Sequence, residues 1–138
     1  MDYKTQYKRW LDCESTDPEL KQELSSLTDE KDIEDRFYRS LEFGTAGLRG
    51  IIGAGTNRMN VHIVRQATKA LADYINSTGE KDSCGVARAY DSRRKSAEFA
   101  KEAALVLCEN GIKVHLFSAL HPVPMLSFAV KHINCTAG

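Results

Sequence analysis

Apolar residues recur at helical spacing through the first third of the chain. Tyr3 and Tyr7 lie on one face of a helix that the first dozen residues are predicted to form. A Thr-Asp-Pro sequence predicts the start of a second, short helix. Thr28 is expected to cap a third helix, which should end near Gly44. The pattern therefore predicts a helical region over residues 1–42, and no chemistry is evident in it.

The rest of the chain alternates between helix and strand patterns. A long amphipathic helix should begin after Asn60, which is a suitable cap, and residues 85–90 are predicted to form a strand. Ser96 is expected to cap the next helix, and residues 112–117 alternate as a second strand. A largely apolar helix then ends near Asn134. This order predicts an α/β fold with a mainly parallel or mixed sheet flanked by helices.

Composition and charge exclude several function classes. The 138 residues include 19 Lys and Arg and 19 Asp and Glu, so the formal charge of +0 argues against a nucleic-acid partner. No apolar run approaches the roughly 20 residues that span a membrane, and the N-terminus lacks the apolar core of a signal peptide. We therefore expect a cytoplasmic protein with no membrane partner.

The 4 cysteines are spread widely and form no CxxC pair. Ordinary buried thiols are the simplest interpretation of such a distribution. No set of His, Cys and carboxylate residues has the spacing of metal ligands either, so no metal site is expected in the chain. The cysteines are Cys13, Cys84, Cys108 and Cys135.

The glycine-rich sequence GTAGLRG at residues 44–50 is the first candidate site. Glycines let backbone amides turn toward an anion, and the guanidinium of Arg49 can hold a phosphate through two parallel hydrogen bonds. The sequence lacks the Gly-Lys-Ser/Thr ending of a Walker loop and does not follow a strand as a dinucleotide fingerprint does. Phosphate binding and a purely structural glycine turn both remain open.

The loop YDSRRKS is the second candidate, because it follows a predicted strand and ligands of open α/β sheets bind at the carboxyl ends of strands. Asp91 could orient an arginine or a ligand hydroxyl, or it could simply tether its own loop while Arg94 and Lys95 stay solvated. Among the histidines, His121 is best placed to face a site, because it lies in the loop after the second strand.

Three segments together strongly resemble the first domain of the α-D-phosphohexomutase superfamily, in its phosphoglucomutase and phosphopentomutase-like branch. They are EDRFYRSLEFGTAGLRGIIGAGTNRMN, YDSRRKS and HPVPMLSFAVKHINCTAG, and the resemblance runs from about Ile33 to the last residue. It implies a four-domain enzyme that moves phosphate between two positions of a sugar phosphate. The resemblance also implies a phosphoserine, a Mg²⁺ ion and a bisphosphorylated intermediate of the glucose 1,6-bisphosphate type.

The resemblance assigns roles to residues that match the family's motifs. Three positions match the active-site loop near the bound sugar phosphate, two match a supporting turn, and two match a loop that braces the catalytic loop. His121 and Val123 stand where relatives often carry hydroxyl residues, which is a departure from the family pattern. The substrate-binding candidates are Thr45, Gly47 and Arg49, and the supporting candidates are Asn57, Arg58, Asp91 and Arg93.

The family's phosphoserine loop would follow Gly138, and its metal loop belongs to a further domain. The sequence is thus expected to hold a helical extension at residues 1–42 and a truncated first domain at 43–138. We expect no catalytic residue, no cofactor and no mutase activity in it, and self-association through an unpaired sheet edge. A free-standing phosphosugar-binding module and a structural or interaction domain remain as alternatives.

Overall fold

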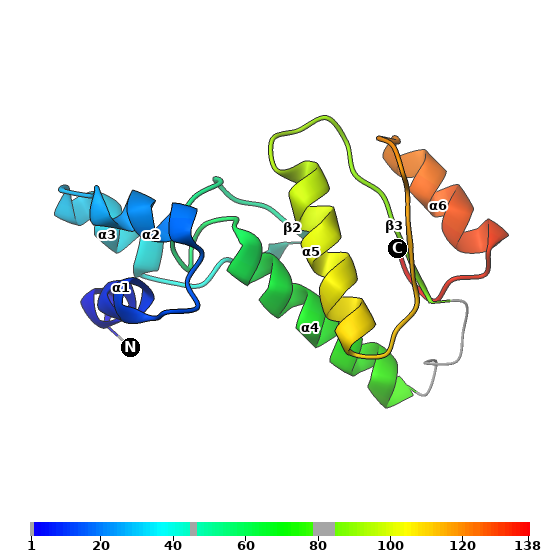
Figure 1. The fold of residues 1–138 in the computed structure, drawn as a ribbon, viewed down its shortest axis with the longest axis horizontal. Helices are drawn as coiled ribbons and strands as arrows, with labels where there is room; N and C mark the ends of the chain where they lie inside the picture. The colour runs from blue at the N-terminus through cyan, green and yellow to red at the C-terminus, as the bar shows by residue number, and fades with distance from the viewer. Residues whose placement is uncertain (1, 45–46, 79–84) are drawn as a thin grey trace. The chain divides into compact units, whose positions relative to one another are not determined.

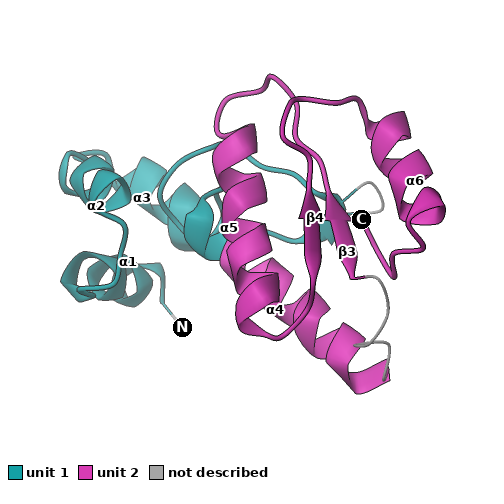
Figure 2. Ribbon diagram, turned by 45° about the vertical axis from the view of Figure 1, so that its right-hand side comes forward, with its two compact units in different colours: residues 1–63 teal, residues 64–138 magenta. Residues whose placement is uncertain are grey.

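The computed structural model describes residues 2–44, 47–78 and 85–138, which form six helices and four short strands (Figure 1). The chain divides into two compact units, Met1–Ile63 and Val64–Gly138 (Figure 2). Each unit is described by itself. The predicted boundary between residues 42 and 43 stays a prediction.

The first unit contains three short helices, two of which meet at one aromatic ring. They are α1 (Tyr3–Asp12), α2 (Pro18–Ser25) and α3 (Glu30–Phe37). Phe37 is 2% exposed and meets the rings of Tyr7 and Trp10 edge-on, at centroid distances of 5.8 and 5.7 Å. The predicted helical N-terminal region is therefore present, and α1 is held to α3 by aromatic contacts.

Two details of the third helix differ from the sequence prediction. Asp29, and not Thr28, is its cap, since its carboxylate accepts the backbone N–H of Lys31 at 3.0 Å. The helix also ends at Phe37, well before Gly44. Thr28 was an equally good cap by residue type, and local sequence does not decide between two neighbouring capping residues.

The glycine-rich segment contains a small hairpin that the sequence analysis did not predict. Strands β1 (Phe43–Gly44) and β2 (Gly47–Leu48) pair antiparallel, with Phe43 opposite Leu48. The two strands are only two residues long, which is too short for an alternating pattern to show in the sequence.

A parallel strand pair forms the centre of the second unit (Figure 2). Helix α4 (Val61–Thr78) leads to strand β3 (Val86–Arg88), and α5 (Ser96–Glu109) connects β3 to β4 (Val114–Leu116). Val86 lies opposite Val114, and an isolated parallel bridge joins Val86 to Ala137 on the other side of β3. The predicted α/β fold with a parallel sheet is confirmed, although both strands are shorter than predicted.

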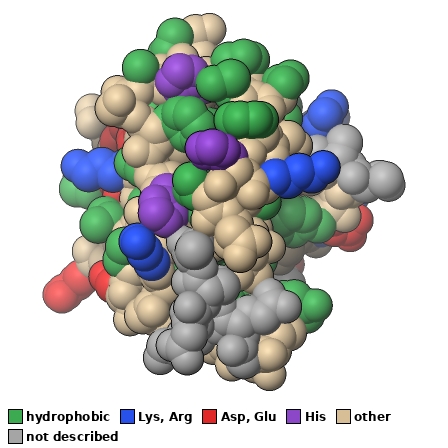
Figure 3. Space-filling view, turned by 90° about the vertical axis from the view of Figure 1, so that its right-hand side faces the viewer, with side chains coloured by type: hydrophobic (Ala, Val, Ile, Leu, Met, Phe, Trp, Pro, Cys, Tyr) green, Lys and Arg blue, Asp and Glu red, His purple; other side chains and the backbone are tan. Residues whose placement is uncertain are grey.

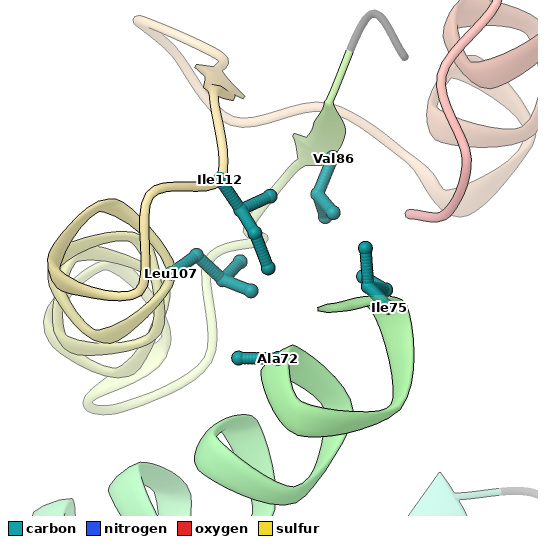
Figure 4. Close-up of a cluster of buried hydrophobic side chains, with 5 residues drawn as sticks. All are labelled: Ala72, Ile75, Val86, Leu107 and Ile112. Carbon is teal, nitrogen blue, oxygen red and sulfur yellow. The ribbon is translucent and has the colours of Figure 1, made fainter. Parts of the chain in front are cut away.

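A cluster of buried apolar side chains lies between α4, α5 and the strand pair (Figure 4). Val86 points from β3 toward Ile75 on α4 and toward Leu107 on α5. Leu107 is 0% exposed and Val86 1%. Ala72 and Ile112 complete the cluster, so the two helices cover one face of the sheet.

The last helix, α6 (Val123–His132), packs against β3 and contains no fully buried residue. Val123 and Phe128 are 73% and 60% exposed. Hydrophobic side chains gather around histidines on the face shown in Figure 3. The Phe128 and His132 rings stack at 5.2 Å. The apolar character predicted for this helix is confirmed, but much of it faces outward.

The start of α5 corrects another prediction. Ser96 is the first residue of the helix and not its cap, which is Lys95 in a left-handed conformation with φ of 63°. The Ser96 hydroxyl instead accepts the backbone N–H of Asp91 at 3.2 Å. Asn60 does cap α4, as predicted, because its side-chain oxygen accepts the N–H of Ile63 at 3.1 Å.

Leu107→Ala should lower the free energy of unfolding by about 2–5 kcal/mol, because it removes a fully buried side chain and leaves a cavity. Leu105→Ala on the same helix is the matched control, since Leu105 is 48% exposed and its loss should change stability by less than about 0.5 kcal/mol. Urea unfolding of both variants measures the difference. Equal losses would contradict the described core.

Candidate functional site

Arg49 follows the β1–β2 hairpin and is exposed. Among the described residues its guanidinium makes no hydrogen bond or ion pair, so its donors are available to a ligand. Gly47 has φ of 93°, a left-handed conformation that glycine adopts without strain. Thr45, the third candidate of this loop, lies outside the described residues.

Arg58 is buried and tied to α3. It is 6% exposed, and its guanidinium lies 2.6 Å from the Asp35 carboxylate. Asn57 binds the same helix, since its side-chain amide donates to the Asp35 carbonyl at 2.9 Å and its backbone N–H donates to the Arg36 carbonyl at 2.9 Å. These contacts favour a supporting role, as the sequence analysis expected, and that role stays a proposal.

Arg36 joins three segments of the first unit. Its guanidinium lies 2.6 Å from Glu23 on α2 and 2.9 Å from Asp32 on α3, and it donates to the carbonyl of Ala54 at 3.1 Å. Burial disfavours its charge, but the hydrogen bonds with Asp32 and Glu23 raise the pKa of Arg36 above its ordinary value. The glycine-rich segment is thus attached to both helices through one cation.

Two further contacts fix the path of the same segment. The side-chain amide of Asn60, 2% exposed, donates to the carbonyls of Gly53 and Gly55 at 2.9 and 3.0 Å. A Cβ at Gly55 would come within 2.7 Å of the Arg36 carbonyl oxygen, so only glycine allows this close approach to α3.

The second candidate loop is closed by its own residues. The Asp91 carboxylate accepts the backbone N–H of Arg93 at 3.0 Å and its side-chain Nε at 2.8 Å. The backbone N–H of Arg93 contributes most to holding the pKa of Asp91 below its ordinary value. Asp91 therefore tethers its loop, and Lys95 is not simply solvated because it pairs with Glu98 at 3.2 Å.

Of the histidines, His121 lies beside the second candidate loop, since its backbone N–H donates to the Tyr90 carbonyl at 3.0 Å. The His121 ring packs against Phe117 at 4.7 Å. His62 accepts the backbone N–H of Asp17 at 3.1 Å. The prediction of buried thiols is wrong for Cys13 and Cys108, which are exposed, because neither side chain lies on the core face of its element. Cys84 lies outside the described residues, and Cys135 is half-buried.

No group of three or more His, Cys, Asp or Glu residues in the described ranges is arranged to hold a metal ion. The resemblance places the Mg²⁺ ligands in a further domain, and no step is assigned to a metal at the described residues. In the same part of the chain, no helix is both long and apolar enough to cross a membrane.

Comparison with known proteins identifies the family. The family model described as "Phosphoglucomutase/phosphomannomutase, alpha/beta/alpha domain I" matches residues 40–138, which include every candidate residue named above. The chain belongs to this phosphoglucomutase/phosphomannomutase family. The α/β fold and the family resemblance drawn from the sequence are thereby confirmed.

Curated relatives are phosphoglucomutases by name. The chain is 40% identical to "Phosphoglucomutase" of Staphylococcus aureus (strain USA300) over 111 residues, which is 79% of the chain and 20% of the relative. It is 36% identical to "Phosphoglucomutase" of Staphylococcus haemolyticus (strain JCSC1435) over 105 residues, or 76% of the chain and 19% of the relative. The chain thus spans about a fifth of the length of these relatives. No solved structure matches it.

The sequence analysis missed the acidic residues that hold this family's glycine-rich segment here. Glu23, Asp32 and Asp35 lie on two helices and converge on Arg36 and Arg58 only in the folded unit. The spacing of Asp32 and Arg36, four residues apart on one helix, was the one signal of these contacts in the sequence.

Arg58→Met should lower the free energy of unfolding by about 1–3 kcal/mol, because it removes charge-assisted hydrogen bonds to Asp35 from a buried position. Arg39→Met is the matched control. Arg39 is exposed and its Nε makes one 3.3 Å hydrogen bond to Asn57, so the change should be below about 0.5 kcal/mol. Chemical denaturation of both variants tests this, and an unaltered stability of Arg58→Met would contradict the described ion pair.

Arg93→Gln should raise the pKa of Asp91 part of the way toward its ordinary value, since the backbone N–H of Arg93 remains after the guanidinium is lost. Because the folded-state pKa is depressed, ionised Asp91 stabilises the fold at neutral pH, and this contribution disappears as the pH falls through that pKa. Carboxyl ¹³C NMR titration measures the shift. Arg94→Gln should leave the Asp91 titration unchanged, and equal effects of both variants would argue against the specific pair.

Proposed function

We propose that residues 1–138 act as the first, phosphate-holding part of a phosphohexomutase. In the longer protein, phosphate would move reversibly between the 1-position and the terminal hydroxymethyl position of a sugar phosphate. The single observation that carries the proposal is Arg49, exposed and without an ion-pair partner among the described residues, next to a glycine-rich hairpin in a chain of the phosphoglucomutase/phosphomannomutase family.

The contacts of the first unit support a binding role for Arg49. Phosphoryl transfer depends mainly on positioning and on neutralising the negative charge that spreads over the transferred group. The neighbouring cations Arg36 and Arg58 are neutralised by carboxylates, so Arg49 is the cation of this segment that is left for a ligand. The fixed path of residues 53–60 would limit the positions that its guanidinium can take.

The supporting residues fit this proposal in a different way. The side chains of Asn57 and Arg58 donate hydrogen bonds to Asp35 of α3. They would therefore hold the segment that follows the hairpin and would not contact the sugar phosphate. Asp91 and Arg93 would give their loop a fixed shape through the contact between them. We assign substrate binding to Arg49, Gly47 and Thr45, and support to the other four.

The chemical step itself would belong to the longer protein. A phosphoserine, a Mg²⁺ ion that neutralises charge on the phosphate, and a bisphosphorylated activator are expected there from the family resemblance. A cytoplasmic location is proposed on the same ground. A free-standing phosphosugar-binding module is the second candidate function, because Arg49 could bind a phosphate without any of these groups.

The decisive experiment is to express the whole open reading frame that contains these codons and to assay conversion of glucose 1-phosphate to glucose 6-phosphate. Arg49→Gln should lower kcat/KM about 10–100-fold through the loss of charge-assisted hydrogen bonds to phosphate. Arg9→Gln, an exposed arginine on α1, should leave kcat/KM unchanged.

Residues 1–138 alone should show no turnover in the same assay, and turnover would contradict the division of roles. A reading frame that stops after residue 138 would refute the enzyme proposal for this product. Binding of glucose 1,6-bisphosphate that is lost in Arg49→Gln would then support the phosphosugar-binding module.

A further inference from the structure

Arg88 is a cation on the same strand as Val86, which belongs to the apolar cluster of the second unit. It is the last residue of β3 and lies opposite Leu116 of β4. Side chains alternate between the two faces of a strand, so Arg88 is on the same face as Val86, whose side chain belongs to the apolar cluster between α4, α5 and the strand pair. An arginine remains charged at any pH at which a protein folds.

The Nε of Arg88 is fully buried and has no hydrogen-bond partner, and it is the one such side-chain atom in the described residues. Burial lowers the pKa of Arg88, because removal from water disfavours the charged form. No carboxylate of the described residues forms an ion pair with it. A buried polar nitrogen without a hydrogen-bond partner destabilises the fold, so Arg88 is present at a cost in stability.

Other shielded arginines of the same chain all have a carboxylate partner. The distances are 2.6 Å from Arg36 to Glu23 and 2.6 Å from Arg58 to Asp35. Arg88 departs from this pattern. Residues that are retained against stability are most often found at functional sites.

The place of Arg88 in the fold points to a ligand. The strands β3 and β4 are parallel, so their carboxyl ends lie at the same edge of the sheet, and the loop after β3 begins there. Open α/β sheets bind their ligands at this edge. Arg94 of this loop is exposed and adds positive charge to the same edge. Arg88 as a whole is only half-buried, and among its side-chain nitrogens Nε alone is fully buried without a hydrogen-bond partner. Arginine holds phosphate through two parallel charge-assisted hydrogen bonds.

We propose that Arg88 binds a phosphate group at the carboxyl edge of β3, as an anion site distinct in sequence from the loop of Arg49. The bound phosphate supplies the negative charge that the protein does not place beside Arg88. This site does not depend on the mutase proposal, because inorganic phosphate or any phosphate monoester has the required chemistry.

Thermal unfolding of the 138-residue chain tests the proposal. The chain is heated in about 10 mM inorganic phosphate, and in acetate and chloride of equal ionic strength. Phosphate should raise the Tm by about 3–6 °C relative to both other anions. Arg88→Met should unfold about 3 °C or more above the unmodified chain in chloride, because the unpaired buried polar atom is gone, and should lose the gain in phosphate.

The control variants separate this site from general charge and from the loop of Arg49. Arg94→Met removes a positive charge from the adjacent loop and should keep the phosphate gain, as should Arg49→Gln. Arg88→Lys preserves the charge without the planar fork, and it should keep less than half of the gain. Arg88→Lys also serves as the test variant if Arg88→Met does not fold.

Four results would overturn the proposal. They are a Tm of the unmodified chain that does not respond to phosphate, an equal response to acetate, an Arg88→Met variant that keeps the gain, and equal losses in Arg88→Met and Arg94→Met. A gain that disappears in Arg49→Gln and persists in Arg88→Met would refute the Arg88 site while supporting the proposed function. An Arg88→Met variant that unfolds at a lower temperature in chloride would show a structural role instead.

Discussion

The ion pairs and the hydrogen bond of the Arg36 guanidinium hold the glycine-rich segment of the first unit against its helices. The glycine-rich segment has few large apolar side chains, so hydrophobic burial cannot fix its position. Charge-assisted hydrogen bonds do so instead, because Arg36 connects Glu23 on α2 with the carbonyl of Ala54, and Glu23 also accepts the Ala54 N–H at 3.1 Å. These contacts hold Ala54, five residues after Arg49, against α2 and α3.

The arginines of the chain fall into two physical classes. Arg36 and Arg58 are shielded from water and neutralised by carboxylates, so they serve the fold. Arg49 is exposed and has no ion-pair partner in the part of the chain that the structure describes, and its charge costs little because water solvates it. The Nε of Arg88 is buried and has no hydrogen-bond partner among the described residues, which is the unfavourable combination. The same residue type thus has different roles according to burial and pairing, and composition alone does not distinguish them.

Sequence predicted the elements whose signal is local and failed where partners are distant. The periodic helices α1 and α5 were found, and the density of glycines marked the segment around Gly47. The strands were predicted too long, since apolar alternation extends beyond the three residues that pair in each. The carboxylates that hold Arg36 and Arg58 were missed, because tertiary folding brings them together from separate helices.

The chemistry of the described residues explains why phosphate binding is proposed for residues 1–138 and phosphoryl transfer for the longer protein. Moving a phosphoryl group needs a nucleophile as well as cations that neutralise charge. The described residues provide cations at Arg49 and Arg88, and no hydroxyl among them pairs with a histidine base in the contacts on either candidate loop. Cations alone can hold a phosphate, and transfer needs the nucleophile as well. We therefore propose that the transfer step uses residues of the longer protein, since the chain spans about a fifth of the length of its relatives.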